Sequence, residues 1–376
     1  MIRKRFRDEC LFILLNARLV IDNPARAKIN KLIARHLSWG KIITISNIHG
    51  VIPFLYYNLS RLGLLNFIPK NELAIIKHFY YTNLMRNSWM EQELFMVLRL
   101  ANQNNITIAL LKGAALLAVL YKHPGLRIMA DLDLLIKEGD FSRTKAILEQ
   151  LGYAEVAAAK LHFCRQEYNY ESIFSKILPG DIPLIVEIHH VLGYSRPHKI
   201  SFPELWERIV TVGDGNQKIT LLSKEDIFLH LSLHLKRHIR KLSLKFLVDI
   251  SELLKNYNDD LDWRYIIKYA QKNRIVSIVY FSIYLAEELL GTNKRSRHIE
   301  IIGALVPSVV KRKLIHYAIN KYNFFSLAKW RCIMVRLLLF DNFSDFLLYL
   351  WRVILIEKFM NKIRKRFMKI APHRVF

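Results

Sequence analysis

Apolar side chains recur every three or four positions through the first hundred residues, which is the spacing of an amphipathic helix. This period is clear in residues 11–21, 28–37 and 71–103, and prolines separate the three segments. The pattern therefore predicts an N-terminal helical region over residues 1–105.

The pattern changes after residue 105 to short apolar runs that alternate or are rich in β-branched residues, as strands are. The candidate strands are ITIALL (106–111), DLDLLI (131–136), YNYESIFS (168–175) and IPLIVEIHHVL (182–192). Helical spacing follows Lys112-Gly113, and it returns after Asp140, which is placed to cap a helix that ends at Gly152. Residues 106–220 are therefore expected to form a small α/β core.

Helical spacing resumes after residue 220 and continues to a basic, aromatic-rich end, KFMNKIRKRFMK (358–369). This predicts a C-terminal helical region with a basic tail over residues 221–376. The expected fold class is α+β, with a small mixed-sheet core flanked by N- and C-terminal helical regions.

The composition is that of a folded protein, because 52% of the residues are hydrophobic and 24% are charged. A net charge of +25 favours polyanionic partners, namely nucleic acid, nucleotide phosphates or an anionic membrane surface. No nucleic-acid reader motif, such as an RRM or a zinc finger, accompanies this charge. Nucleic acid is therefore one partner among several that the charge allows.

A reducing compartment is expected, because three widely spaced cysteines suit neither a disulfide framework nor a CxxC metal site. We expect no transmembrane segment, since the most hydrophobic stretch, residues 346–356, is too short to span a bilayer and contains Arg352. The expected location is the cytoplasm. The basic tail leaves membrane association open, because it could lie on anionic lipid.

An acidic pair, Asp131 and Asp133, is the clearest candidate for chemistry. Residues two apart on a strand point to the same face, so these two carboxylates would repel each other unless a cation bridged them. A divalent ion such as Mg²⁺ takes hard oxygen ligands and keeps positions open for phosphate oxygens. The pair therefore predicts a metal site at the end of a largely apolar strand.

A third carboxylate, Glu187, lies in the apolar strand candidate 182–192 and faces the same way as His189. If this strand pairs beside residues 131–136, three acidic side chains converge, which is the ligand set for two-metal phosphoryl or nucleotidyl transfer. His189 could assist from outside the metal ligands, or it could simply be a hydrogen-bonded strand histidine. His230, His234 and His238 share one helical face, for which packing is the simpler interpretation than zinc binding.

Phosphate groups need donors, and three residues near the acidic pair could supply them. Lys112 and Gly113 stand between a strand and a helix, where backbone N–H groups and the lysine charge could hold an anion. Arg127 could bind a phosphate with two hydrogen bonds, or it could pair with Asp131 or Asp133. We expect Lys112, Gly113 and Arg127 to form the nucleotide-binding part of the site.

Residues 110–153 strongly resemble a bacterial uncharacterised nucleotidyltransferase family, part of the superfamily that contains DNA polymerase β. The matching positions are Lys112, Gly113, Tyr121, Arg127, Asp131, Asp133, Gly152 and Tyr153. The later EIHH stretch and the region around Asp249 are also similar to the family, whose resemblance covers most of residues 30–290. The wider superfamily carries Gly-Ser before its acidic pair, where this chain has Lys112-Gly113.

The resemblance implies a polymerase-β-like fold in which Asp131 and Asp133 bind two ions, Mg²⁺ or Mn²⁺, and Glu187 binds the catalytic one. The expected reaction moves a nucleoside monophosphate from an NTP, most simply ATP, to an acceptor hydroxyl and releases pyrophosphate. The acceptor could be a small molecule, a protein, a tRNA end or a polysaccharide precursor. Two alternatives are a binding protein on this fold that has lost catalysis and a basic peripheral membrane protein.

Overall fold

A computed structural model describes most of the chain. The described residues are 7–156, 171–178, 181–190, 202–213, 218–239, 242–291, 297–321, 335, 337–347 and 351. The basic tail at 358–369 and most of the hydrophobic stretch 346–356 lie outside them. No helix within these ranges is both long and apolar enough to cross a membrane.

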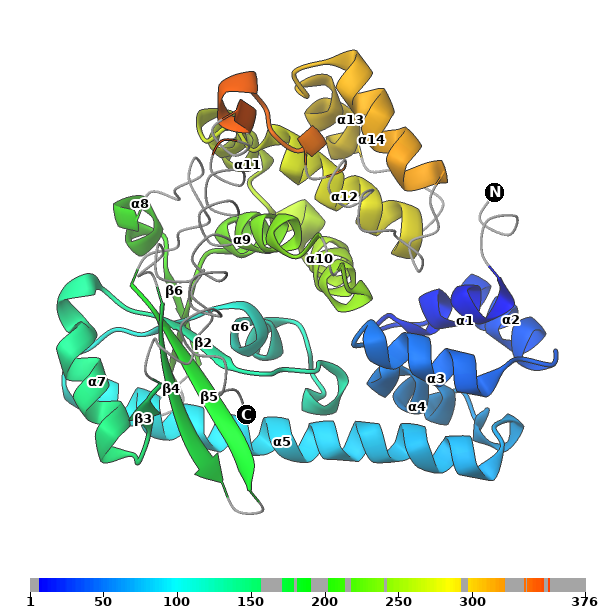
Figure 1. Ribbon diagram of the computed structural model, residues 1–376, viewed down its shortest axis with the longest axis horizontal. Helices are drawn as coiled ribbons and strands as arrows, with labels where there is room; N and C mark the ends of the chain where they lie inside the picture. Colours follow the sequence, from blue (N-terminus) through cyan, green and yellow to red (C-terminus); the bar gives the residue numbers. More distant parts are fainter. Residues whose placement is uncertain are drawn as a thin grey trace, which may run out of the picture.

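The N-terminal region is helical as predicted, and its longest helix supports the rest of the molecule. The helices are α1 (Asp8–Asn16), α2 (Asn23–Ile33), α3 (Trp39–Ile48), α4 (Ile52–Arg61) and α5 (Lys70–Gln103). Figure 1 shows α5 running along the lower edge from these helices to the strands. The start of α2 has the usual capping residues: Asp22 accepts a hydrogen bond from Ala25 N, and Pro24 occupies the first turn of the helix.

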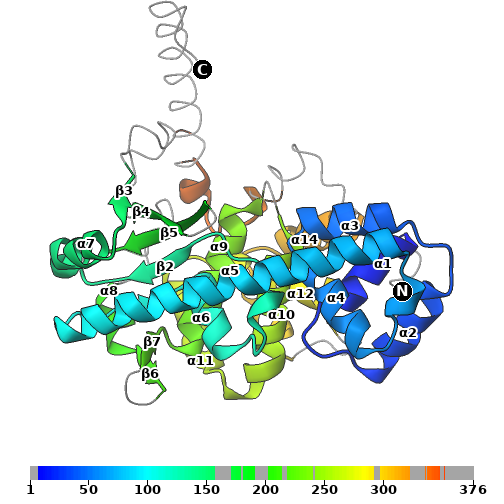
Figure 2. The ribbon, with the colours of Figure 1, turned by 90° about the horizontal axis from the view of Figure 1, so that it is seen from below.

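The core is a mixed seven-stranded sheet with the order β3-β4-β5-β2-β1-β7-β6. The strands are β1 (Ala109–Leu110), β2 (Leu132–Leu135), β3 (Ala154–Glu155), β4 (Glu171–Leu178), β5 (Ile182–His189), β6 (Val210–Val212) and β7 (Ile219–Leu221). The helices between them are α6 (Lys112–Val119), α7 (Phe141–Gln150) and α8 (Phe202–Glu207). Figure 2 shows α7 beside β3 to β5 and α5 passing across the sheet.

Two strand pairings position the chemistry. β2 and β5 are parallel neighbours, and their register sets Asp133 opposite Glu187. β4 and β5 form an antiparallel hairpin whose turn includes Asp181 with a φ of +57°, a left-handed conformation that Asp tolerates better than most residues. The expected pairing of the strand candidates 131–136 and 182–192 is therefore confirmed for residues 132–135 and 186–189, while residues 191 and 192 lie outside the described residues.

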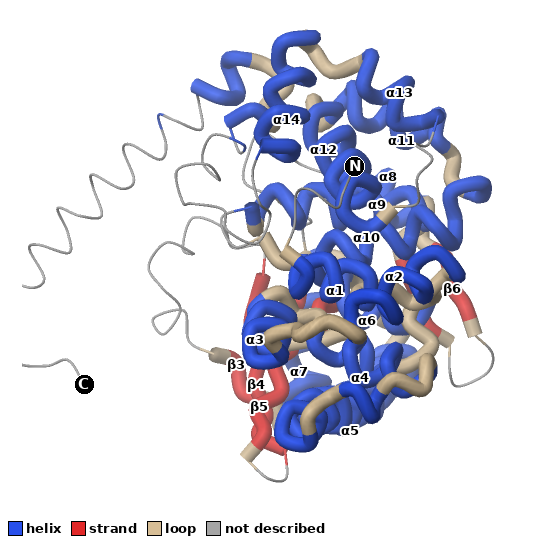
Figure 3. Tube along the Cα trace, turned by 90° about the vertical axis from the view of Figure 1, so that its right-hand side faces the viewer, coloured by secondary structure: helices blue, strands red, loops and turns tan. Residues whose placement is uncertain are grey.

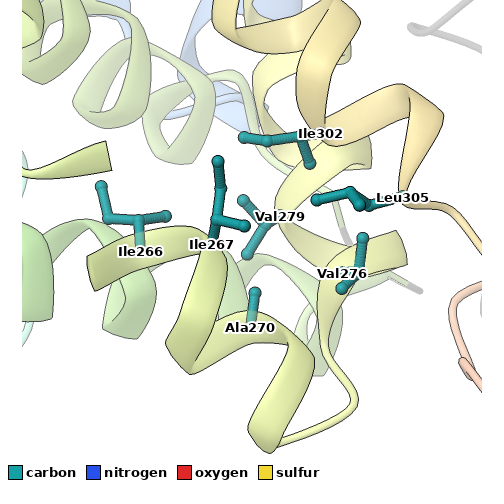
Figure 4. A pocket seen from close by; sticks show the side chains of 7 residues that line it. All are labelled: Ile266, Ile267, Ala270, Val276, Val279, Ile302 and Leu305. Atoms are coloured by element: carbon teal, nitrogen blue, oxygen red, sulfur yellow. The ribbon is translucent and has the colours of Figure 1, made fainter. Parts of the chain in front are cut away.

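The remaining helices form a C-terminal helical layer. They are α9 (Lys224–Arg237), α10 (Leu244–Tyr257), α11 (Trp263–Lys272), α12 (Val276–Leu290), α13 (Arg297–Ala304) and α14 (Val309–Lys321). In this layer, α9 and α10 lie nearest to the sheet core, and α12, α13 and α14 lie beyond them (Figures 1 and 3). Side chains cap α9 and α11, because Ser223 accepts from Asp226 N and Asp262 accepts from Tyr265 N. A pocket between α11, α12 and α13 is lined only by apolar side chains, among them Ile266, Val279 and Leu305 (Figure 4). Its lining therefore contains no polar or ionisable side chain that could take part in chemistry.

The predicted α+β class is confirmed, and local details differ. The first strand is limited to Ala109–Leu110, since the neighbouring positions of 106–111 connect to helices on both sides. Strands β6 and β7 were not expected, because their short segments show no strong alternation. Asp140 stands at the N-cap of α7 but makes no capping hydrogen bond; its carboxylate pairs with Arg143 instead.

Candidate active site

Neighbouring strands bring Asp133, Glu187 and His189 together. Asp133 lies in β2 opposite Glu187 in β5, and His189 follows Glu187 by two positions, so both β5 side chains point to the same face. The Nε2 atom of His189 lies 2.9 Å from Asp133 Oδ1 and 3.8 Å from Glu187 Oε2. One ligand atom from each of the three residues lies within 4.8 Å of the others.

This group has the composition of a divalent-metal site. Its side chains are largely enclosed, with exposed fractions of 3% for Asp133, 7% for His189 and 12% for Glu187. Two carboxylates favour a hard cation such as Mg²⁺ or Mn²⁺, and an imidazole nitrogen is a common additional ligand for transition metals. The residues present therefore fit a metal ion, with Glu187 the most accessible of the three.

Lys112 provides the positive charge that balances these carboxylates. The backbone turns sharply from β1 into α6 at Lys112, whose φ is +44°, and the turn directs its Nζ to the Asp133 carboxylate. The same Nζ is 3.9 Å from Glu187 Oε2. Burial alone would lower the pKa of Lys112, but the charges of Asp133 and Glu187 raise it above its usual value. Lys112 is therefore a cation at neutral pH.

The ionisation of Asp133 follows from the same contacts. Burial by itself would raise the pKa of this carboxyl, whereas the charge of Lys112 and the hydrogen bond with His189 hold it well below its usual range. An ionised, buried carboxylate with two donors on it is rigid as well as charged. Asp133 is thus the best-placed metal ligand of the group.

Asp131 stands apart from this compact group. It precedes β2, is half-buried, and its side chain does not join the mutually close set of Asp133, Glu187 and His189. Burial and then the charge of Asp133 raise its pKa, and Lys112 opposes this rise. The two aspartates therefore influence each other electrostatically, as their spacing predicts, while His189 takes a closer place than the sequence suggested.

Arg127 is engaged by a residue that the sequence analysis did not select. Its guanidinium donates from Nε to Asp249 Oδ1 at 3.0 Å and from Nη2 to Asp249 Oδ2 at 2.8 Å. Tyr121 Oη also donates to Asp249 Oδ1, at 2.7 Å. The Asp249 side chain is fully buried and that of Arg127 is 8% exposed, so this pair connects α10 to the segment before β2.

Helix α5 holds the backbone of that same segment. The side-chain amide of Asn83 donates to Gly125 O and Arg127 O, and that of Asn87 donates to Pro124 O and Arg127 O. Because the carbonyls of a loop must find donors when they are buried, two asparagines one turn apart fix the course of this loop. The loop then delivers Asp131 and β2 to the site.

Comparison with known proteins identifies the family. A family model described as uncharacterised nucleotidyltransferase matches residues 35–291. The chain belongs to this nucleotidyltransferase family. The match contains α3 to α12, and with them every candidate site residue named above. Comparison with the curated proteins gives no match.

Membership of the nucleotidyltransferase family agrees with the mixed sheet and its flanking helices, and it supports nucleotidyl transfer as the general activity. The acidic residues of this family member gather where β2 and β5 run side by side. The structure thus assembles a site from segments that are separated by tens of positions in the sequence.

Gly113 has a packing reason to be glycine in this nucleotidyltransferase. A Cβ atom at this position would lie 2.6 Å from Arg127 Nη1 and 2.7 Å from Met129 Sδ. Arg127 cannot easily move away, because Asp249 holds its guanidinium from two sides. Close approach of α6 to the Arg127 side chain therefore requires a residue without a side chain.

Replacing Gly113 with alanine is expected to destabilise the protein by about 1–3 kcal/mol, the usual cost of overpacking a well-filled interior. Urea denaturation of Gly113→Ala and of the unchanged protein measures this difference. Gly139→Ala is the matched control, since a Cβ there meets nothing within 4 Å. Equal unfolding midpoints for both variants would show that the crowding at Gly113 is not real.

A buried histidine on α9 borders the site and was interpreted from the sequence as a packing residue. Burial and then the positive charge of Lys112 lower the pKa of His230 to about 3, while Asp133 has the opposite effect. His230 is therefore neutral at physiological pH. Its side chain is buried, which agrees with the interpretation of His230 as a packing residue.

Sequence reasoning missed the site's supporting residues for an identifiable reason. Asp249, Asn83 and Asn87 act through contacts between helices that are far apart in the chain, and no local spacing marks such contacts. One signal was available: a single Asp in the apolar helical run LKFLVDISELL requires a buried partner. Arg127, whose partner the sequence left open, was a candidate for that buried partner.

Proposed function

We propose that this protein is a metal-dependent nucleotidyltransferase that moves an NMP from an NTP, most simply ATP, to an acceptor hydroxyl. The observation that carries the proposal is the enclosed group of Asp133, Glu187 and His189 on neighbouring strands of a nucleotidyltransferase-family chain. Asp131 is not part of this close group, but it is coupled electrostatically to Asp133 and would supply a third carboxylate.

The proposed reaction exchanges one phosphorus–oxygen bond for another. The acceptor oxygen bonds to the α-phosphorus while the bond from that phosphorus to the α,β-bridging oxygen breaks, and pyrophosphate leaves with the electron pair. The acceptor proton must pass to a nearby base. Glu187 suits this task better than Asp133, because its carboxylate is the more exposed of the two. Lys112 and His189 also lower the pKa of Asp133, which makes that carboxylate a weak proton acceptor.

Mg²⁺ or Mn²⁺, two ions in the proposal, would neutralise the phosphates and polarise the acceptor when bound by Asp131, Asp133 and Glu187. His189 would orient Asp133 through its hydrogen bond and could serve as a further ligand. Lys112 is a cation at the edge of the same carboxylates and would contact a phosphate oxygen. Gly113 lets α6 approach Arg127 closely, and Arg127 contributes through the position it gives the loop.

A labelling experiment tests the proposal. The full-length protein is incubated with cell extract, Mg²⁺ or Mn²⁺, and each of ATP, CTP, GTP and UTP labelled at the α-phosphate. We expect a metal-dependent product that retains the label, is lost on chelation with EDTA, and is absent with the double variant Asp131→Ala, Asp133→Ala. Label transfer that persists in the double variant would refute this site, and the absence of transfer from every nucleotide would argue for a binding protein.

A further inference from the structure

Helix α10 carries two charged side chains one turn apart, and one of them, Asp249, reaches the loop that carries Arg127 and Asp131. Residues four apart on a helix share a face, and Lys245 and Asp249 have this spacing. Both carboxylate oxygens of Asp249 are already used, since Oδ1 accepts from Tyr121 and Arg127 and Oδ2 accepts from Arg127. Asp249 therefore has little capacity left to neutralise Lys245.

Lys245 carries a positive charge that nothing in the described part of the chain pairs. Three other partly buried lysines each contact a carboxylate, namely Lys112 on Asp133, Lys176 on Glu93 and Lys255 on Glu252. Lys245 Nζ instead lies over the Phe246 ring, 5.3 Å from the ring centroid, in a cation–π contact. A partly buried cation without an ion pair costs folding free energy, so a ligand is the natural reason to keep it.

The direction of the Lys245 side chain is fixed by its surroundings. Its backbone N–H donates to His49 O at 3.1 Å, and Ser243 Oγ donates to the same carbonyl at 2.5 Å. Its aliphatic stem packs over Gly50, where an added Cβ would lie 3.0 Å from Lys245 Cδ. Gly50 has a φ of +67°, so the turn between α3 and α4 both requires glycine and leaves room for the lysine stem.

The charges around Lys245 belong to the site. Burial and the nearby Arg127 lower the pKa of Lys245, while Asp249 and Asp131 oppose this effect. Lys245 and Asp131 therefore influence each other electrostatically, and Lys245 lies one helical turn from Asp249, which holds the Arg127 side chain. Arg127 and Arg86 are the other cations there; the side chain of Arg127 donates to Asp249, and Arg86 Nη2 donates to Ala130 O at 3.1 Å. Lys245 differs from both arginines, because its ammonium group has no hydrogen bond or ion pair among the described residues.

We propose that Lys245 binds the polyphosphate of the nucleotide and supplies the phosphate contact that the Arg127–Asp249 pair cannot supply. This inference rests on the proposed function, because it takes an NTP as the ligand. Lysine is a suitable residue for this task, since its ammonium group is a compact charge with three donors that can follow a phosphate group.

Calorimetric titration of the full-length protein tests the role of Lys245. Mg·ATP, inorganic tripolyphosphate and adenosine are titrated separately into the unchanged protein, Lys245→Met and Lys245→Arg. We expect Lys245→Met to weaken binding of ATP and tripolyphosphate by about tenfold or more, as for loss of a charged hydrogen bond, and Lys245→Arg to retain most of the affinity. Adenosine binding should be the same in all three proteins.

Lys255→Met is the matched control, because it makes the same substitution on the same helix at a lysine that is paired with Glu252. It should leave the affinity for ATP and tripolyphosphate unchanged. Thermal unfolding without nucleotide provides a second readout. Lys245→Met should melt at the same or a higher temperature, since it removes an unpaired charge.

Three outcomes would overturn the inference. Binding of ATP and tripolyphosphate by Lys245→Met at the level of the unchanged protein would remove Lys245 from the site while the proposed function stands. A lower melting temperature of nucleotide-free Lys245→Met would show that Lys245 is a structural cation. A failure of the unchanged protein to bind any NTP in the presence of Mg²⁺ would overturn both the inference and the proposed function.

Discussion

Replacement of Asp133 by asparagine is expected to reduce label transfer by about 10³-fold or more, equivalent to roughly 4 kcal/mol of transition-state stabilisation. Asparagine has nearly the same shape, but it lacks the charge that would hold a divalent ion. It also no longer matches the charge of Lys112, whose Nζ contacts Asp133 Oδ1. The measurement is the initial rate of product labelling at saturating metal, compared with metal affinity from calorimetry.

Asp140→Asn is the control for Asp133→Asn, since Asp140 pairs with Arg143 away from the acidic group. It should leave label transfer unchanged. Glu187→Gln and His189→Gln then distinguish the remaining roles. If His189 only orients Asp133, its variant should lose less activity than Glu187→Gln and keep its metal affinity. Label transfer by Asp133→Asn within tenfold of the unchanged protein would contradict the assignment of Asp133 as a metal ligand.

Replacement of Asp249 by asparagine is expected to destabilise the fold by about 3–5 kcal/mol, because it leaves the buried guanidinium of Arg127 without its counter-charge. The pair is enclosed, with exposed fractions of 8% for Arg127 and 0% for Asp249. The Tyr121 hydroxyl loses a charged acceptor in the same variant. Equilibrium unfolding in urea gives the change in free energy.

The double variant Arg127→Met, Asp249→Leu separates loss of the pair from burial of an unpaired charge. It removes both charges, so it should recover much of the stability lost in Asp249→Asn. Asp262→Asn is the control for the single variant, since Asp262 caps the exposed start of α11 and asparagine also caps well. A loss below about 1 kcal/mol for Asp249→Asn would mean that water reaches the pair and that Arg127 is not enclosed.

The sequence permitted a correct prediction of a small mixed-sheet core flanked by helices, because much of that information is local. The period of apolar residues located α5 and α9 to α12, and alternation located β2, β4 and β5. The short strands β3, β6 and β7 escaped because segments of two or three residues have too few positions for a pattern. β7 lies next to β1 and β6 pairs with β7, an arrangement that depends on packing from elsewhere in the chain.

The site was predictable in its acids and less so in its neighbours. Asp133 and Glu187 were recognisable because a charge in an apolar strand must have a purpose, and the parallel pairing of β2 with β5 brings them together. The lone Asp249 in an apolar helix signalled a buried partner, but the sequence did not indicate that this partner is Arg127. Asp249 lies 122 positions away, and its choice over Asp131 depends on how α10 docks on the sheet core.

The two asparagines of α5 imply that the α/β segment 106–220 does not by itself fix the loop that precedes β2. Asn83 and Asn87 belong to the N-terminal helical region and Asp249 belongs to the C-terminal one. Hydrogen bonds from both regions therefore hold the Arg127 loop in place. A fragment limited to residues 106–220 would keep the acidic residues of the site but lose the three side chains that hold the Arg127 loop. In the proposed active site, the flanking helices hold the loop that leads to Asp131.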